Sequence, residues 1–193
     1  MSKRLSKRLF VKLCLVLVLV IANGILLFRV PDATYRTVAE RISNTWNSPS
    51  RDFTEISMNE ALKMMEDSDE DVLLFFGFDD CPHCKIAHPL LLAVANEQNT
   101  NYKVRFVRTR DVLGKLTYTE KQRKELTRYI PEYMSRNEDM DNKLWLYVPT
   151  MIRLKDGKVV DGHAGLLGEN ESMDTMTKAQ EKELMKIYHR LLK

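Results

Sequence analysis

Apolar and polar positions in the first half of the soluble part alternate between strand and helix patterns. The run 71–78 holds five consecutive apolar residues between acids and a glycine, which is typical of a central strand buried on both faces. Residues 53–56 and 102–107 are shorter strand candidates. Ser57-Met58-Asn59-Glu60 is a capping box, and it predicts a helix that continues to about Glu66.

The second half continues the alternation. Helical spacing predicts helices over 84–98 and 119–136, the second charged and interrupted by Pro131. Residues 150–154 and 158–160 flank Asp156-Gly157, a strong signal for a β-hairpin with a tight turn. A last helix over 176–192 is predicted by the apolar face that Leu184, Ile187, Tyr188 and Leu191 form.

This order of elements predicts an α/β fold over residues 52–193. A βαβ unit followed by a helix, a hairpin and a closing helix gives a mixed sheet with helices on both faces. In open sheets of this kind, chemistry usually occurs where a strand ends and the next helix begins.

An apolar stretch at 9–28 predicts one transmembrane helix before this domain. Twenty residues span about 30 Å as a helix, the thickness of the hydrocarbon core of a bilayer. The Lys/Arg-rich segment 1–8 marks the N-terminus as cytoplasmic, and so places the domain outside the cytoplasmic membrane. A cleaved signal peptide is the alternative, but the apolar run continues through 25–28 without an A-x-A-like site.

Residues 29–51 are expected to form a juxtamembrane helix and a linker. Aromatic and aliphatic residues recur there at helical spacing before the breaker Asn47-Ser48-Pro49-Ser50.

The charge of the chain is uneven. The net charge is +3, but residues 1–29 contain six Lys or Arg and no acid, which leaves 24 basic and 27 acidic residues in the remainder. A remainder of −3 gives no basic footprint for nucleic acid.

The chain has three cysteines, too few for a disulfide-stabilised scaffold. Cys14 lies in the apolar stretch and is expected to be a small apolar residue in lipid. Cys81 and Cys84 form a C-x-x-C pair where the buried strand gives way to a helix. Unpaired backbone N–H groups and the helix dipole favour the thiolate of Cys81, and His83 is expected to add to this. Cys84 is expected to be the resolving thiol.

Two motifs resemble the thioredoxin superfamily. Cys81-Pro82-His83-Cys84 resembles the disulfide-oxidase branch, and Val148-Pro149-Thr150 resembles the loop that carries a cis proline beside the cysteines. The resemblance implies a thioredoxin-like fold, a groove at Val148, Pro149 and Thr150 that holds substrate backbone, and thiol–disulfide exchange supported by Pro82 and His83 without a cofactor. The short membrane-anchored architecture also resembles accessory proteins of bacteriocin production.

Two positions depart from the family pattern. Asp80 stands where thioredoxins commonly have Trp, and its charge is expected to oppose a thiolate at Cys81. Phe75 stands where many thioredoxins have a buried acid, which leaves proton transfer to water, His83 or Asp80.

Several readings stay open. The expected partners are thiols or disulfides of exported proteins and an unidentified redox partner, with the oxidase or isomerase direction favoured. A reductase, or a non-catalytic binding module attached to a secretion system, is the alternative. A metal site of Cys81, His83, Cys84 and His88 is disfavoured because the pair follows a buried strand, and covalent haem attachment would need His where Lys85 stands.

Overall fold

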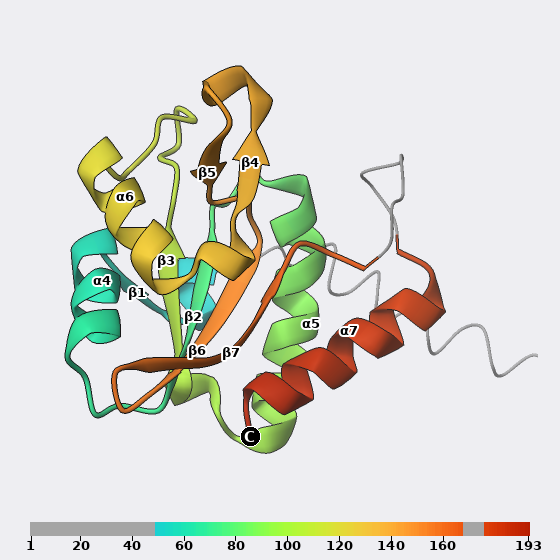
Figure 1. Cartoon of the computed structure of the whole chain (residues 1–193). Helices are drawn as coiled ribbons and strands as arrows, with labels where there is room; N and C mark the ends of the chain where they lie inside the picture. The colour runs from blue at the N-terminus through green and yellow to red at the C-terminus, as the bar shows by residue number, and fades with distance from the viewer. Residues whose placement is uncertain (1–48, 168–175) are drawn as a thin grey trace, which may run out of the picture. The chain divides into compact units, whose positions relative to one another are not determined.

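A five-stranded mixed sheet forms the centre of the computed structural model, which describes residues 49–167 and 176–193 (Figure 1). The strand order is β1-β3-β2-β6-β7. β1 and β2 run parallel to β3, whereas β6 is antiparallel to both β2 and β7. In this order the strands span Thr54–Ile56, Val104–Arg108, Val72–Gly77, Thr150–Lys155 and Lys158–Ala164.

Helices cover both faces of this sheet, which confirms the predicted α/β class with its mixed sheet (Figure 1). One face packs against α5 and α7, and the other against α4 and α6. A short helix, α3, precedes β1. The α-helices of the described residues span Pro49–Asp52 (α3), Met58–Glu66 (α4), Pro82–Gln98 (α5), Glu120–Tyr129 (α6) and Lys178–Leu191 (α7).

Strand β2 is buried along its whole length, as its apolar run predicts. Leu73 and Phe75 pack toward α5 and α7, whereas Leu74 and Phe76 pack toward α4 and α6. Since successive side chains of a strand point to opposite faces, only a continuous apolar run can serve both cores. This strand carries the chain directly to Cys81.

Local signals set several boundaries as expected. The capping box of Ser57 and Glu60 is formed at the start of α4. Asp156 and Gly157 both have positive φ, 51° and 68°, between β6 and β7, which is the geometry that a primed hairpin turn requires. The apolar face of α7 is buried in the core at Leu184, Tyr188 and Leu191.

Three boundary predictions were wrong. The predicted helix 119–136 ends at Tyr129, and Pro131 is followed by a 3₁₀ turn and a small two-stranded sheet of β4 (Ser135–Asn137) and β5 (Lys143–Trp145). Proline lacks the N–H that would continue the helix. Residues 101–103 form a 3₁₀ turn rather than the start of a strand. Residues 49–51, predicted as linker, belong to α3.

The predicted anchor at 9–28, the segment 1–8 and most of 29–51 lie outside the described residues. Within 49–167 and 176–193, no helix has the length and apolar character needed to cross a membrane.

Candidate active site

Cys81 and Cys84 lie together at the junction of β2 and α5. Cys81 is the N-cap residue of α5, Pro82 opens the helix, and the backbone N–H of Cys84 donates a hydrogen bond to the Cys81 sulfur at 3.1 Å. Helix α5 therefore begins two residues earlier than its apolar spacing predicts, because the sulfur satisfies one of the N–H groups that a helix start leaves unpaired. Both cysteines are free thiols.

The surroundings of Cys81 favour its thiolate. A hydrogen bond from the Cys84 side chain lowers the pKa of Cys81 most, and the backbone N–H groups of Cys84 and His83 and the charge of Lys85 lower it further, against the opposing effect of burial. The groups that hold the negative charge thus all come from the first turn of α5.

Cys84 is in the opposite state. Its side chain is fully buried, and burial raises its pKa strongly, with further increases from the adjacent Cys81 and the charge of Asp79. A thiol in this environment keeps its proton until the neighbouring sulfur changes state. The surroundings therefore favour the thiolate at Cys81 and the protonated thiol at Cys84.

Gly77 lets Cys84 lie against the end of β2. A Cβ atom built on Gly77 would lie 3.2 Å from the Cys84 sulfur and 3.3 Å from the rings of Phe75 and Phe106. The absence of a side chain at this position leaves room for the Cys84 thiol beneath the strand end.

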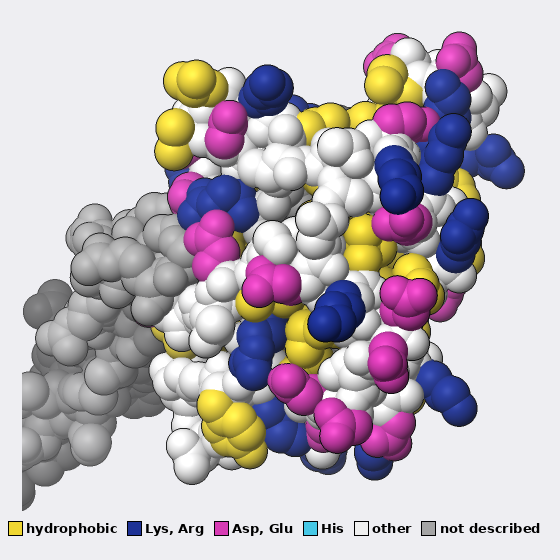
Figure 2. Space-filling view, turned by 90° about the vertical axis from the view of Figure 1, so that its left-hand side faces the viewer, with side chains coloured by type: hydrophobic (Ala, Val, Ile, Leu, Met, Phe, Trp, Pro, Cys, Tyr) yellow, Lys and Arg dark blue, Asp and Glu magenta, His cyan; other side chains and the backbone are white. Residues whose placement is uncertain are grey.

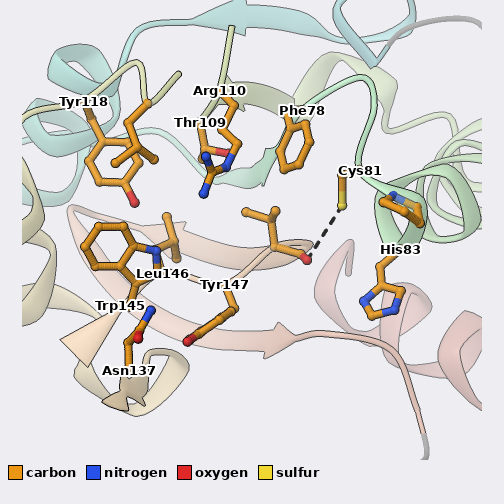
Figure 3. Close-up of a pocket in the computed structure, with 13 residues that line it drawn as sticks. Phe78, Cys81, His83, Thr109, Arg110, Tyr118, Asn137, Trp145, Leu146 and Tyr147 are labelled. Atoms are coloured by element: carbon orange, nitrogen blue, oxygen red, sulfur yellow. Dashed lines mark hydrogen bonds between the residues drawn. The ribbon is translucent and has the colours of Figure 1, made fainter. Parts of the chain in front are cut away.

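Two side chains have roles that differ from those expected. Asp80 is exposed and pairs with Lys85 at 3.6 Å, so the two charges offset each other beside the cysteines. His83 lowers the pKa of Cys81 through its backbone N–H, and Figure 3 shows its imidazole extending away from the Cys81 sulfur.

The loop 147–150 faces Cys81 from the other side. The Val148–Pro149 peptide bond is cis, as the resemblance implies. The Cys81 thiol donates a hydrogen bond to the carbonyl of Val148 at 3.8 Å, shown as the dashed line in Figure 3. Thr150 fixes the loop by donating from its hydroxyl to the carbonyl of Tyr147 at 2.5 Å. The two motifs, 67 residues apart at this contact, meet at the reactive sulfur.

A pocket of about 310 Å³ opens beside Cys81. Figure 3 shows Cys81 and His83 on one side of it, Tyr118, Trp145 and Asn137 on the opposite side, and Phe78 and Arg110 between them. The residues that line it come from the β2–α5 junction and from the segment 109–148. None of the described lining residues is acidic.

Arg123 supports the far wall of this pocket from behind. Its side chain is only 4% exposed, its guanidinium makes two hydrogen bonds of 2.7 Å to Glu120, and it donates to the carbonyl of Leu144 at 2.5 Å. The same guanidinium lies 6.0 Å from the centre of the Trp145 ring. The charged segment 120–128 therefore contains one buried arginine that contacts the pocket wall, beside its exposed charges.

His88 is buried one helical turn after Cys84. It is 3% exposed, its Nε2 lies 3.0 Å from the Asp52 carboxylate, and its ring stacks on Phe75. Burial lowers the pKa of His88, although the charge of Asp52 opposes this shift. Phe75, at the position of the missing acid, thus packs against a buried histidine that pairs with a half-buried aspartate.

Within the described ranges, no group of three or more His, Cys, Asp or Glu side chains is arranged to hold a metal ion. No protein-family model matches the chain, and no curated protein matches it. The fold and the paired cysteines are consistent with a thioredoxin-like domain and suggest thiol–disulfide chemistry.

Sequence reasoning placed the cysteines and the proline loop but missed the pocket wall. Tyr118, Trp145 and Arg110 carry no motif, and they converge only through long-range packing. The signal that was available was the concentration of aromatic residues with Arg and Asn in 109–147, of which only 119–136 was assigned a structure, as a charged helix.

Proposed function

We propose that the protein is a membrane-anchored thiol–disulfide oxidoreductase whose domain acts on cysteines of exported proteins. Cys81 forms the mixed disulfide with substrate, and Cys84 resolves it. Pro82 and His83 set the start of α5, while Val148, Pro149 and Thr150 form the loop beside which substrate backbone binds.

The contrast between the two thiols carries this proposal. The pKa of Cys81 is lowered by its neighbours, and the pKa of Cys84 is raised by burial. A structural pair or a metal ligand pair needs no such difference, whereas an exchange reaction needs one sulfur that reacts with substrate and one that waits.

The direction we propose is oxidation or isomerisation. Stabilisation of the Cys81 thiolate favours the dithiol form over the disulfide, so the disulfide form passes its oxidation on to substrate. In this direction a substrate thiolate attacks the sulfur of Cys81 in the disulfide form of the protein. The Cys81–Cys84 bond breaks, and Cys84 leaves with the electron pair and takes up a proton. A second substrate thiol then releases Cys81 as thiolate.

Trapping tests the roles of the two cysteines. We expect Cys84→Ser to accumulate disulfide-linked adducts with exported proteins, and the Cys81→Ser/Cys84→Ser double variant to accumulate none. Non-reducing electrophoresis followed by mass spectrometry of the full-length protein gives the result. Adducts that survive the loss of Cys81 would reverse the assignment, and an unchanged phenotype with both cysteines replaced would favour a non-catalytic binding module.

Redox equilibrium tests the direction. Incubation of the full-length protein in glutathione buffers is expected to give a reduction potential near or above about −180 mV, in the range of isomerases and oxidases. A potential near about −270 mV, typical of thioredoxin, would favour the reductase.

A reporter fusion tests the location. An enzyme reporter joined after Lys193 should be active only outside the cytoplasm, because the cationic segment 1–8 precedes the predicted anchor at 9–28. Cytoplasmic reporter activity would contradict the proposed topology without affecting the exchange chemistry.

A further inference from the structure

We propose that the pocket beside Cys81 binds a carboxylate, and that the preferred substrates are polypeptides with Asp or Glu close to the reacting cysteine. This proposal rests on the proposed function and adds a substrate class to it. Hydrogen-bond donors of four different residues converge on the hollow, and no described residue lining it is acidic.

Arg110 supplies the positive charge. Its guanidinium lies 5.8 Å from the centre of the Phe78 ring, and Nη1 donates to the carbonyl of Gly114 at 2.7 Å. These contacts fix its position, and neither neutralises it. Among the described residues, no carboxylate pairs with Arg110, and Figure 3 shows the guanidinium directed into the hollow.

Neutral donors accompany this charge. Figure 3 shows the Tyr118 hydroxyl and the Trp145 ring nitrogen directed toward the same hollow, and neither has a hydrogen-bond acceptor among the described residues. Asn137 accepts from the N–H of Asp139 through Oδ1 at 3.0 Å, which leaves its NH₂ group free to donate. Arginine and neutral N–H and O–H donors together match the oxygen atoms of a carboxylate.

The acids nearest to this pocket are engaged elsewhere. The carboxylate of Asp79 pairs with Arg108 at 2.5 Å, and that of Asp111 accepts two hydrogen bonds from the turn that follows it, at Leu113 and Lys115. Glu120 pairs with Arg123. Asp80, next to Cys81, pairs with Lys85. Across residues 49–167 and 176–193, no carboxylate is therefore paired with Arg110.

The pocket differs from the face that α4 and α6 present. Figure 2 shows acidic and basic side chains interspersed on the face over α4 and α6, so that face offers no single-sign attraction for a charged partner. The pocket has one cation, aromatic walls and the reactive sulfur within a volume of about 310 Å³. The pocket has a size that suits one acidic side chain of an extended substrate polypeptide whose reacting cysteine lies next to Cys81.

The experiment compares matched peptides that differ at one position. Short peptides with a single cysteine and Glu, Gln or Lys two residues away react with the oxidised full-length protein, and stopped-flow measurement gives each rate of exchange. Each rate is divided by the rate of the same peptide with neutral hydroxyethyl disulfide, because the neighbouring charge also alters the reactivity of the peptide thiol. The Glu peptide is expected to exceed the Gln peptide about tenfold, with the Lys peptide slowest.

Variants connect the preference to the pocket. Arg110→Gln should abolish the preference for Glu, Tyr118→Phe should reduce it, and Arg110→Lys should keep part of it. Arg128→Gln is the matched control, because this arginine is exposed on α6 and lies outside the pocket. Alkylation of Cys81 by a neutral reagent shows whether the reactive thiol of each variant is intact.

The outcomes separate the two proposals. If no peptide exchanges, the proposed function fails. If all peptides exchange at equal normalised rates, or Lys is preferred, only the carboxylate inference is overturned. Fast normalised exchange with reduced glutathione, a small thiol that carries carboxylates, without a preference for any of the acidic peptides would assign the site to a small thiol and would also overturn the polypeptide substrate class.

Discussion

The two walls of the pocket are built in different ways. The wall that carries Cys81 is local: its hydrogen bonds and charges come from His83, Cys84 and Lys85, all within the first turn of α5. The opposite wall is assembled from three separate pieces, namely the turn at 110–116, α6 and the β4–β5 sheet. The environment of the Cys81 sulfur is therefore set by a few neighbouring residues, whereas the shape of the pocket depends on contacts between segments far apart in the sequence.

The largest expected effect is the difference between the two thiols of the local wall. In a Cys14→Ser background at pH 7, limiting iodoacetamide should label Cys81 at least about 100-fold faster than Cys84, since only the thiolate reacts. Peptide mapping by mass spectrometry measures the ratio. Because the pKa of Cys81 is lowered, its labelling should persist as pH falls below about 8.5, the usual value for cysteine. Equal labelling rates for Cys81 and Cys84 would contradict the predicted difference between the two thiols.

The second effect tests the distributed wall. Arg123→Ala removes the donor to the Leu144 carbonyl and the cation beside Trp145, and should lower the free energy of unfolding by about 2–3 kcal/mol. Denaturant unfolding measures this change, with exposed Arg128→Ala as the control, expected within about 0.5 kcal/mol. Labelling of Cys81 should be retained in folded Arg123→Ala protein. If folded Arg123→Ala protein lost Cys81 reactivity as well as stability, the two walls of the pocket would not be independent.

The third effect concerns the support beneath the local wall. Burial lowers the pKa of His88, so the neutral imidazole stabilises the fold fully above the unfolded value of about 6.5, and this stability is lost as pH falls below it. When the pH is lowered from 7.5 to 5.5, the free energy of unfolding of His88→Leu should therefore fall by about 1 kcal/mol less than that of the wild-type protein. The free energy of unfolding of Asp52→Asn should fall by more than that of the wild-type protein over the same pH range, because this variant lacks the charge that opposes the lowering of the His88 pKa. Identical pH profiles for all three proteins would exclude His88 as the titrating group.

The smallest effect concerns one charge. Lys85→Gln should slow the labelling of Cys81 by less than about twofold below neutral pH, since Lys85 is exposed and is the weakest of the groups that lower the pKa of Cys81. Lys85→Arg should preserve the rate, and added salt should reduce the difference between the two variants. A tenfold decrease in the labelling rate of Lys85→Gln would mean that the hydrogen bonds at the start of α5 lower the pKa of Cys81 less than their number indicates.

The sequence predicts the local wall better than the distributed one for a physical reason. The apolar run of β2, the C-x-x-C pair and the Asp156-Gly157 turn act over a few residues, so their patterns survive in the chain. Arg123 appears as one charge among several in a polar stretch, and its burial depends on Glu120 and on Trp145, 22 residues away. His88 was missed for the same reason, since its partner Asp52 lies in a different helix.

The position of β2 in the middle of the sheet has a consequence for biosynthesis. β2 pairs with β3 on one edge and with β6 on the other, and β6 begins only at Thr150. A chain that emerges from its N-terminal end therefore presents both cysteines while one edge of their supporting strand is still unpaired. Until the last quarter of the polypeptide has emerged, these thiols have neither the Val148 carbonyl nor the completed pocket beside them. The two thiols of the nascent protein are thus open to oxidants before the pocket beside them is complete.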